Sequence, residues 1–162
     1  MVYYCLANVH LVVVDVVCSF IRLNRKERRA DSEVHFFTSH FYSSLAKDGA
    51  KAVTSWTAKK NIDSFTKKFI FVPINQSLHW SLCVVVNPGA IMNQVEYSEN
   101  DVPEEALLPC MFFFDSLKAH RQATITRNVR SWLNSEWKRL KKGKEESPFD
   151  KQTMKVFSPR GE

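Results

Sequence analysis

Glycine is scarce in this chain, with four residues among 162. None of the four has the neighbours of a glycine-rich phosphate loop, which excludes nucleotide binding by a P-loop or a Rossmann fingerprint. The four cysteines form no C-x-x-C pair and no Cys/His cluster at zinc-ligand spacing, so a structural zinc site is not expected. Unpaired cysteines fit a reducing compartment, and we expect a nuclear or cytoplasmic protein without a cofactor.

A clean membrane-spanning run is also missing. The most apolar stretch, residues 1–23, is interrupted by Asn8, His10 and Asp15, and no basic residue precedes it. An aspartate near the centre of a spanning helix costs about 2.5 to 3.5 kcal/mol, and the features of a signal peptide are absent. We therefore expect a buried helix or strand here and no membrane partner. Residues 1–30 are interpreted as a divergent N-terminal segment, first apolar and then basic.

The chain does have one domain's length and a concentrated positive charge. Its 44% hydrophobic residues suffice for a core. The net charge of the chain is +6. Residues 118–144 contain nine basic residues and one acid, which gives this segment a charge of +8 and leaves −2 for the rest of the chain. An acidic, proline-containing loop is predicted over residues 87–109. The basic character thus belongs to one segment.

Hydrophobic patterns predict a mixture of helices and strands. A three- and four-residue spacing of apolar residues from Val34 to Leu45 predicts a helix that starts near Asp31 or Ser32 and stops at Gly49. A polar stretch follows it. The same spacing predicts a basic helix over about residues 123–142. Short continuous apolar runs predict buried strands, in a sheet covered on both faces, at residues 68–74, 80–86 and 110–114, with a further strand beginning at 154–157.

Two of these predicted strands carry a His and an Asp at ends that would meet. His79 opens one strand and Asp115 closes another. If the two strands are antiparallel neighbours, the imidazole and the carboxylate lie together at one edge of the sheet. A carboxylate in that position fixes the tautomer of the ring and stabilises the imidazolium, which suits a general base and its orienting group. The packing of a His at a strand edge is the alternative interpretation.

Several stretches resemble the ubiquitin-like-protein-specific (SUMO-specific) cysteine proteases. The similarity is carried by FIFVPINQSLHWSLCVVVNPG at residues 69–89 and FFFDSL at 112–117, with supporting matches at residues 36–45, 55–65 and 156–159. The resemblance implies an α+β, partial papain-like fold of the SUMO-protease type, with a central, mostly antiparallel sheet packed by helices. Residues 31–162 would then be part of the catalytic domain.

The resemblance also implies a function and site residues. The family removes ubiquitin-like modifiers by cleavage after Gly-Gly, so the expected partners are SUMO or another ubiquitin-like protein and its conjugates. His79 would be the general base, Asp115 its orienting residue, and Trp80 one wall of the narrow tunnel for the diglycine tail. A flat indole can lie over a backbone without side chains and exclude bulkier residues.

The family's oxyanion Gln and its nucleophile, in an Asp-Cys-Gly segment, would follow the last predicted strand. The chain ends at Glu162 before either appears. Cys83 is about 13 Å along its strand from His79 and Cys110 about 16 Å from Asp115, so neither can replace the nucleophile. We expect this piece to be inactive by itself.

Two other functions remain open at this point. One is a non-catalytic module that binds a ubiquitin-like protein through the region of Trp80. The other is a basic nucleic-acid-binding domain that uses the +8 segment, although Trp132 and Trp137 have the spacing of core residues in a helix. A solvated helix surface explains the same charge, so nucleic acid is not the expected partner.

Overall fold

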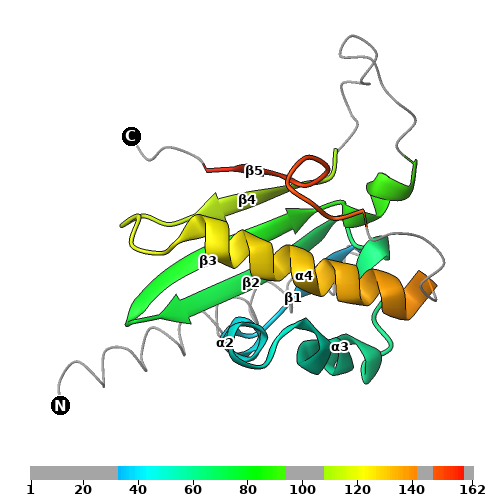
Figure 1. Cartoon of the computed structure of the whole chain (residues 1–162), viewed down its shortest axis with the longest axis horizontal. Helices are drawn as coiled ribbons and strands as arrows, with labels where there is room; N and C mark the ends of the chain where they lie inside the picture. The colour runs from blue at the N-terminus through cyan, green and yellow to red at the C-terminus, as the bar shows by residue number, and fades with distance from the viewer. Residues whose placement is uncertain (1–32, 94–107, 142–147, 159–162) are drawn as a thin grey trace, which may run out of the picture.

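The computed structural model describes residues 33–93, 108–141 and 148–158 (Figure 1). The predicted apolar segment and most of the predicted acidic loop lie outside these residues. The helices are α2 (Ser39–Asp48), α3 (Ala50–Ala58) and α4 (Gln122–Lys141), with 3₁₀ helices at Ser64–Thr66 and Pro88–Asn93. The strands are β1 (Val34–Phe36), β2 (Phe69–Gln76), β3 (His79–Val86), β4 (Cys110–Phe114) and β5 (Lys155–Phe157).

The described strands form a five-stranded sheet in the order β1-β2-β3-β4-β5. The central pairs β2–β3 and β3–β4 are antiparallel, whereas β1–β2 and β4–β5 are parallel. The α+β class is confirmed. The predicted antiparallel pairing is confirmed in the long central strands, and the sheet is mixed because the short edge strands β1 and β5 run parallel to their neighbours.

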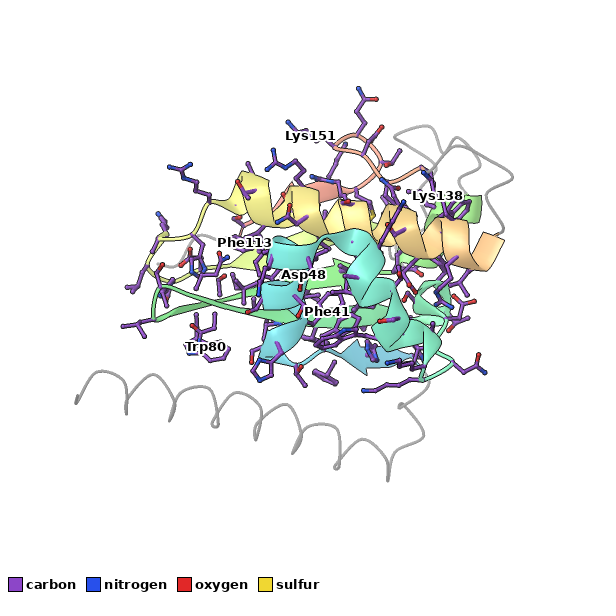
Figure 2. The ribbon with its side chains drawn as sticks, turned by 60° about the horizontal axis from the view of Figure 1, so that its bottom comes forward. Phe41, Asp48, Trp80, Phe113, Lys138 and Lys151 are labelled. Carbon is purple, nitrogen blue, oxygen red and sulfur yellow. The ribbon has the colours of Figure 1, made fainter. Side chains whose placement is uncertain are left out.

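One face of the sheet forms the core with the helices. Alternate residues of the strands point to this face, and α4 lies across it in Figure 1. Ile70 and Val72 of β2 share one cluster of buried side chains with Phe41 of α2 and Trp132 of α4. The rings of Phe41 and Trp132 meet edge to face, with centroids 5.3 Å apart. Figure 2 shows Phe41 near the contact between α2 and the sheet.

The opposite face is also apolar. Side chains from three strands surround a shallow hollow of about 320 Å³ on it: Phe69, Phe71, Leu82, Val84, Val86, Phe112 and Phe114. Within the described residues, the core cluster places α2, α3 and α4 on the first face. Of the two covered faces that were predicted, the described helices account for one.

The predicted N-terminal helix is wrong in its first part. Val34–Phe36 is a strand that pairs with Phe69–Phe71 of β2, and α2 begins at Ser39. The apolar spacing runs without a break from a short strand into a helix, so it imitates one continuous helix. The predicted stop is confirmed, since α2 ends at Gly49, which has a φ of 82° that glycine adopts without strain.

The stretch after Gly49 is helical rather than merely polar. It forms α3, in which Val53 and Thr57 are buried. Few apolar residues point to the core from this helix, so the periodic signal is weak. The three predicted central strands, the basic helix and the strand near residue 155 are confirmed, with boundaries that differ by a few residues.

Candidate active site

His79 and Asp115 lie together at one end of the central strands. A two-residue turn, Ser77 and Leu78, joins β2 to β3 with positive φ values of 51° and 63°, as in a tight hairpin. The turn places His79 first in β3. Leu82 of β3 pairs with Phe114 of β4, so Asp115, one residue further on, lies diagonally across from His79 at the same end of the sheet. His79 Nε2 is 2.6 Å from Asp115 Oδ1, and the two side chains are 14% and 4% exposed. The juxtaposition predicted from the sequence is observed.

The environment of Asp115 favours its ionised form. Burial raises the pKa of this carboxyl, but hydrogen bonds outweigh the effect and bring the pKa below its ordinary value. Asp115 Oδ2 accepts the backbone N–H of His120 at 2.8 Å, and Oδ1 accepts that of Leu117 at 3.2 Å as well as the His79 contact. Because Nε2 of His79 faces the carboxylate, Nδ1 is the ring nitrogen that can exchange a proton with a reacting group.

His120 is a residue of this site that the sequence analysis missed. Its Nδ1 is 2.7 Å from Ser81 Oγ and its Nε2 is 3.1 Å from the carbonyl oxygen of Gln76. Its ring centroid is 4.7 Å from that of His79. The sequence feature that could have indicated His120 is its position, five residues after Asp115 in the connection to a predicted helix.

His79, Asp115 and His120 are also the one group in the described ranges whose ligand atoms could hold a metal ion, with these atoms all within 4.8 Å of one another. The separation of 2.6 Å between His79 and Asp115 is a hydrogen-bond distance. Ligand atoms about 2.0 to 2.2 Å from a tetrahedral zinc ion stand farther apart from each other. Both ring nitrogens of His120 are engaged as well. His79 and Asp115 therefore form a hydrogen-bonded pair while the His120 ring bonds to Ser81 and Gln76, and this geometry does not fit a zinc centre.

The two described cysteines lie away from His79. Cys83 is fully buried, and burial raises the pKa of its thiol to about 12. It follows His79 by four residues, about 13 Å, along the same strand. Cys110 pairs with Val86 at the far end of β3, and burial raises the pKa of its thiol too. Neither thiol is placed to react with His79 as its base, and Cys5 and Cys18 lie outside the described residues.

Trp80 follows His79 and points to the other face of the sheet. It pairs with Asn75 across the hairpin and is half-buried. Figure 2 shows its ring on the side of the sheet away from α4. Trp80 therefore borders the end of the sheet where the His79–Asp115 pair lies.

The basic helix α4 lacks exposed aromatic residues for stacking on nucleic-acid bases. Trp132 is fully buried and Trp137 is nearly so. Lys138 of α4 and Lys151 of the following loop, both labelled in Figure 2, are among the residues around a hollow of about 410 Å³. No helix in the described part of the chain is long and apolar enough to cross a membrane.

A mixed sheet with helices on one face and a His–Asp pair at the end of its central strands is the arrangement of the papain-like class of cysteine peptidases. The chain belongs to the Ulp1 protease family: the family's C-terminal catalytic domain, Peptidase_C48, matches residues 10–158. The resemblance inferred from the sequence motifs is thus confirmed.

Relatives and solved structures agree with this family. The chain is 33% identical over 138 residues to the probable ubiquitin-like-specific protease 2B of Arabidopsis thaliana. This alignment covers 78% of the chain and 14% of the relative. It is 25% identical over 208 aligned positions to human sentrin-specific protease 7, covering 92% of this chain and 19% of the relative. A crystal structure of a de-sumoylating protease is 26% identical with a TM-score of 0.65, covering 88% of this chain and 49% of that one. The chain thus spans less than half the length of each.

Proposed function

We propose that the protein is a cysteine-type peptidase that removes ubiquitin-like modifiers, and that the described residues supply its general base and orienting carboxylate. The contact of 2.6 Å between His79 Nε2 and Asp115 Oδ1 carries this proposal. An imidazole held in this way presents Nδ1 to a thiol and can take its proton. Asp115, which stays ionised, stabilises the imidazolium that results.

His79 would act twice in the reaction. As a base it takes the thiol proton, so that the thiolate attacks the carbonyl carbon of the terminal glycine of the modifier. As an acid it then donates that proton to the departing lysine amine, or to the amine of the next residue of a precursor. Water hydrolyses the thioester and regenerates the thiol. The described cysteines do not fit the role of the thiol, because Cys83 is buried in the core and Cys110 lies at the far end of β4.

Trp80 is proposed as the residue that selects the diglycine tail. It adjoins His79 in the chain and offers a half-buried indole. A flat ring close to the reacting carbonyl leaves room for glycine backbone and obstructs a Cβ. The proposed partners are SUMO or another ubiquitin-like protein and its conjugates. The human relative is a sentrin-specific protease, and one solved relative, whose similarity of 20% identity bears on the fold alone, was crystallised with yeast SUMO. We place the protein in the nucleus or cytoplasm, where thiols such as Cys83 and Cys110 stay reduced.

A binding and trapping experiment tests the proposal. The chain is titrated with SUMO that ends in Gly-Gly and, separately, incubated with SUMO vinyl sulfone, which traps a reactive thiol. We expect measurable binding that weakens when the two glycines are removed, and no covalent adduct at Cys83 or Cys110. An adduct at either cysteine would overturn the assignment of both as inert. Failure to bind SUMO, ubiquitin and related modifiers would overturn the proposed partner class.

The non-catalytic binding module predicts the same affinity but no cleavage. In that case a form of the protein with a reactive thiol does not turn over a SUMO conjugate, whether or not it carries His79→Ala. A peptidase loses turnover, with a decrease of about 10²-fold or more for removal of a general base. The nucleic-acid alternative is not favoured, because Trp132 and Trp137 are buried.

A further inference from the structure

We propose that His120 is a positioning residue for the His79–Asp115 pair, which it ties to the β2–β3 hairpin. This inference rests on the proposed role of His79 as the general base. His120 lies between β4 and α4, on the same connection as Asp115. It does not replace either member of the pair, since its own ring nitrogens are directed at Ser81 and Gln76.

The backbone of His120 acts on the carboxylate. Its N–H donates to Asp115 Oδ2 at 2.8 Å. This bond occupies one oxygen of the carboxylate and leaves the other, Oδ1, directed at His79 Nε2. The orientation of the carboxylate therefore depends on where the backbone of residue 120 is held.

The side chain of His120 holds that backbone in place. The carbonyl oxygen of Gln76 can only accept a hydrogen bond, so Nε2 of His120 carries a proton and donates it over 3.1 Å. In the neutral ring, Nδ1 then accepts from the Ser81 hydroxyl at 2.7 Å. Gln76 and Ser81 lie on the two strands of the hairpin whose turn leads into His79. One imidazole thus links the segment of the orienting residue to the segment of the base.

The ring of His120 also limits the position of the His79 ring. The two centroids are 4.7 Å apart with an interplanar angle of 58°. The remainder of the connection offers less support, because Ser116, Leu117, Lys118 and Ala119 are all exposed. Among the described contacts, the His120 side chain is a second attachment of this connection to the hairpin, beside the contact of Asp115 with His79.

The inference is tested in the chain itself and needs neither SUMO nor a catalytic thiol. The probe is the Nε2 proton of His79, which a hydrogen bond of 2.6 Å to a carboxylate shifts downfield in the proton NMR spectrum and protects from exchange with water. We expect His120→Ala to accelerate this exchange by at least about tenfold. His120→Phe, which keeps a ring but loses both nitrogens, and Ser81→Ala should give smaller accelerations. His120→Asn, whose amide can reach Ser81, should restore part of the protection.

Controls separate positioning from general loss of structure. Lys118→Ala, an exposed change in the same connection, should leave the proton as protected as in the wild type. Asp115→Asn should abolish the downfield signal, and it shows how the spectrum looks when the hydrogen bond to His79 is lost completely. The global free energy of unfolding is measured for each variant by urea denaturation. If His120→Ala does not fold, His120→Phe and Ser81→Ala decide the question.

Faster exchange of the His79 proton with unchanged global stability supports the inference. Wild-type exchange in the folded His120 and Ser81 variants overturns it, as does a change that merely parallels the loss of global stability. Because no modifier is present, this result is independent of whether the chain binds SUMO.

Discussion

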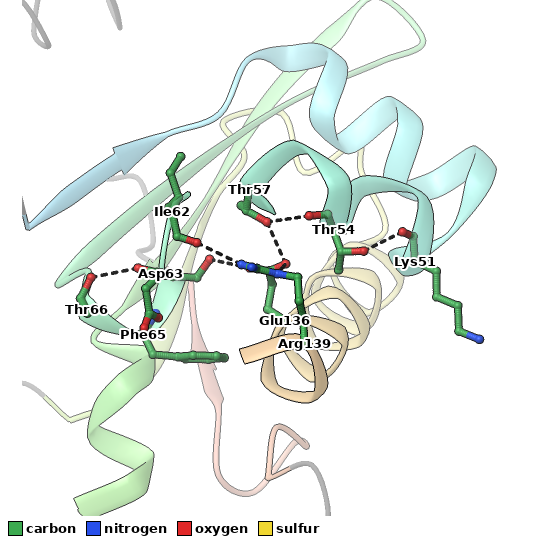
Figure 3. Close-up of polar contacts among 10 residues, drawn as sticks. Lys51, Thr54, Thr57, Ile62, Asp63, Phe65, Thr66, Glu136 and Arg139 are labelled. Atoms are coloured by element: carbon green, nitrogen blue, oxygen red, sulfur yellow. Dashed lines mark hydrogen bonds and ion pairs between the residues drawn. The ribbon is translucent and has the colours of Figure 1, made fainter. Parts of the chain in front are cut away.

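The Thr57 hydroxyl of α3 donates to Oε1 of Glu136 in α4 over 2.8 Å, and this carboxylate is fully buried (Figure 3). Glu136 also accepts from the Ser64 hydroxyl at 3.2 Å. Arg139, one helical turn later, donates to both of its oxygens and to the carbonyl of Ile62. A single acid in the basic segment therefore joins two helices and the connection between α3 and β2.

Removal of this carboxylate should destabilise the fold. We expect Glu136→Ala to lower the free energy of unfolding by about 3 kcal/mol, because Arg139 loses the fully buried partner of its ion pair and the Ser64 and Thr57 hydroxyls lose their bonds to the carboxylate. Urea denaturation followed by circular dichroism measures the loss. Glu33→Ala is the matched control: Glu33 pairs with Lys68 at 2.8 Å, but both side chains are about half exposed, so its loss should stay within about 0.5 kcal/mol. Equal losses in the two variants would contradict the role of burial.

Asp115 should make stability depend on pH in the acid range. Its pKa in the folded chain lies below the ordinary 3.8, so the folded state binds the proton less readily than the unfolded state. The resulting stabilisation is fully present above the ordinary value and is lost as the pH falls through the lower folded pKa.

The wild type and Asp115→Asn are compared by urea denaturation at pH 7 and at about pH 3. We expect the variant to be less stable at pH 7 and the difference to shrink in acid. Asp48→Asn, at an exposed position at the end of α2, should change the acid profile less. A difference that is constant with pH would argue against an ionised Asp115 in the folded chain.

Cys83 should resist alkylation in the native protein. With a pKa of about 12, about one thiol in ten thousand is ionised at pH 8, and the side chain has no access to solvent. Iodoacetamide at pH 8, followed by peptide mass mapping, should therefore leave Cys83 unmodified until urea is added. Cys110 is less buried and should react sooner than Cys83. Modification of Cys83 in the absence of denaturant would contradict its place in the core.

Trp80 should contribute to affinity only when the modifier carries its diglycine tail. We expect Trp80→Ala to weaken binding of SUMO that ends in Gly-Gly by at least tenfold, which corresponds to about 1.4 kcal/mol. SUMO without the two glycines should bind the wild type and the variant equally. Calorimetry of the four combinations measures the coupling between the indole and the tail. An equal loss with both forms of SUMO would assign Trp80 to another contact.

The central part of the fold and the meeting of His79 with Asp115 were predictable from the sequence. Strands β2, β3 and β4 are continuous apolar runs, and α4 has a clear helical spacing of large apolar residues. Once β3 and β4 are antiparallel neighbours, a His at the start of one and an Asp at the end of the other are adjacent. The chemistry of the pair then follows from the residue types.

The remaining features depend on partners that are distant in the chain. Val34–Phe36 is a strand because β2 is available for pairing, and α3 is attached to α4 by Thr57 and Glu136, 79 residues apart. His120 contacts Ser81 and Gln76, 39 and 44 residues away. Local apolar patterns report which residues avoid water, so by themselves they determined the central strands, α4 and the position of the His–Asp pair. Hydrogen bonds between polar side chains leave no such pattern, and only the tertiary structure decided which polar groups are buried together and which support the site.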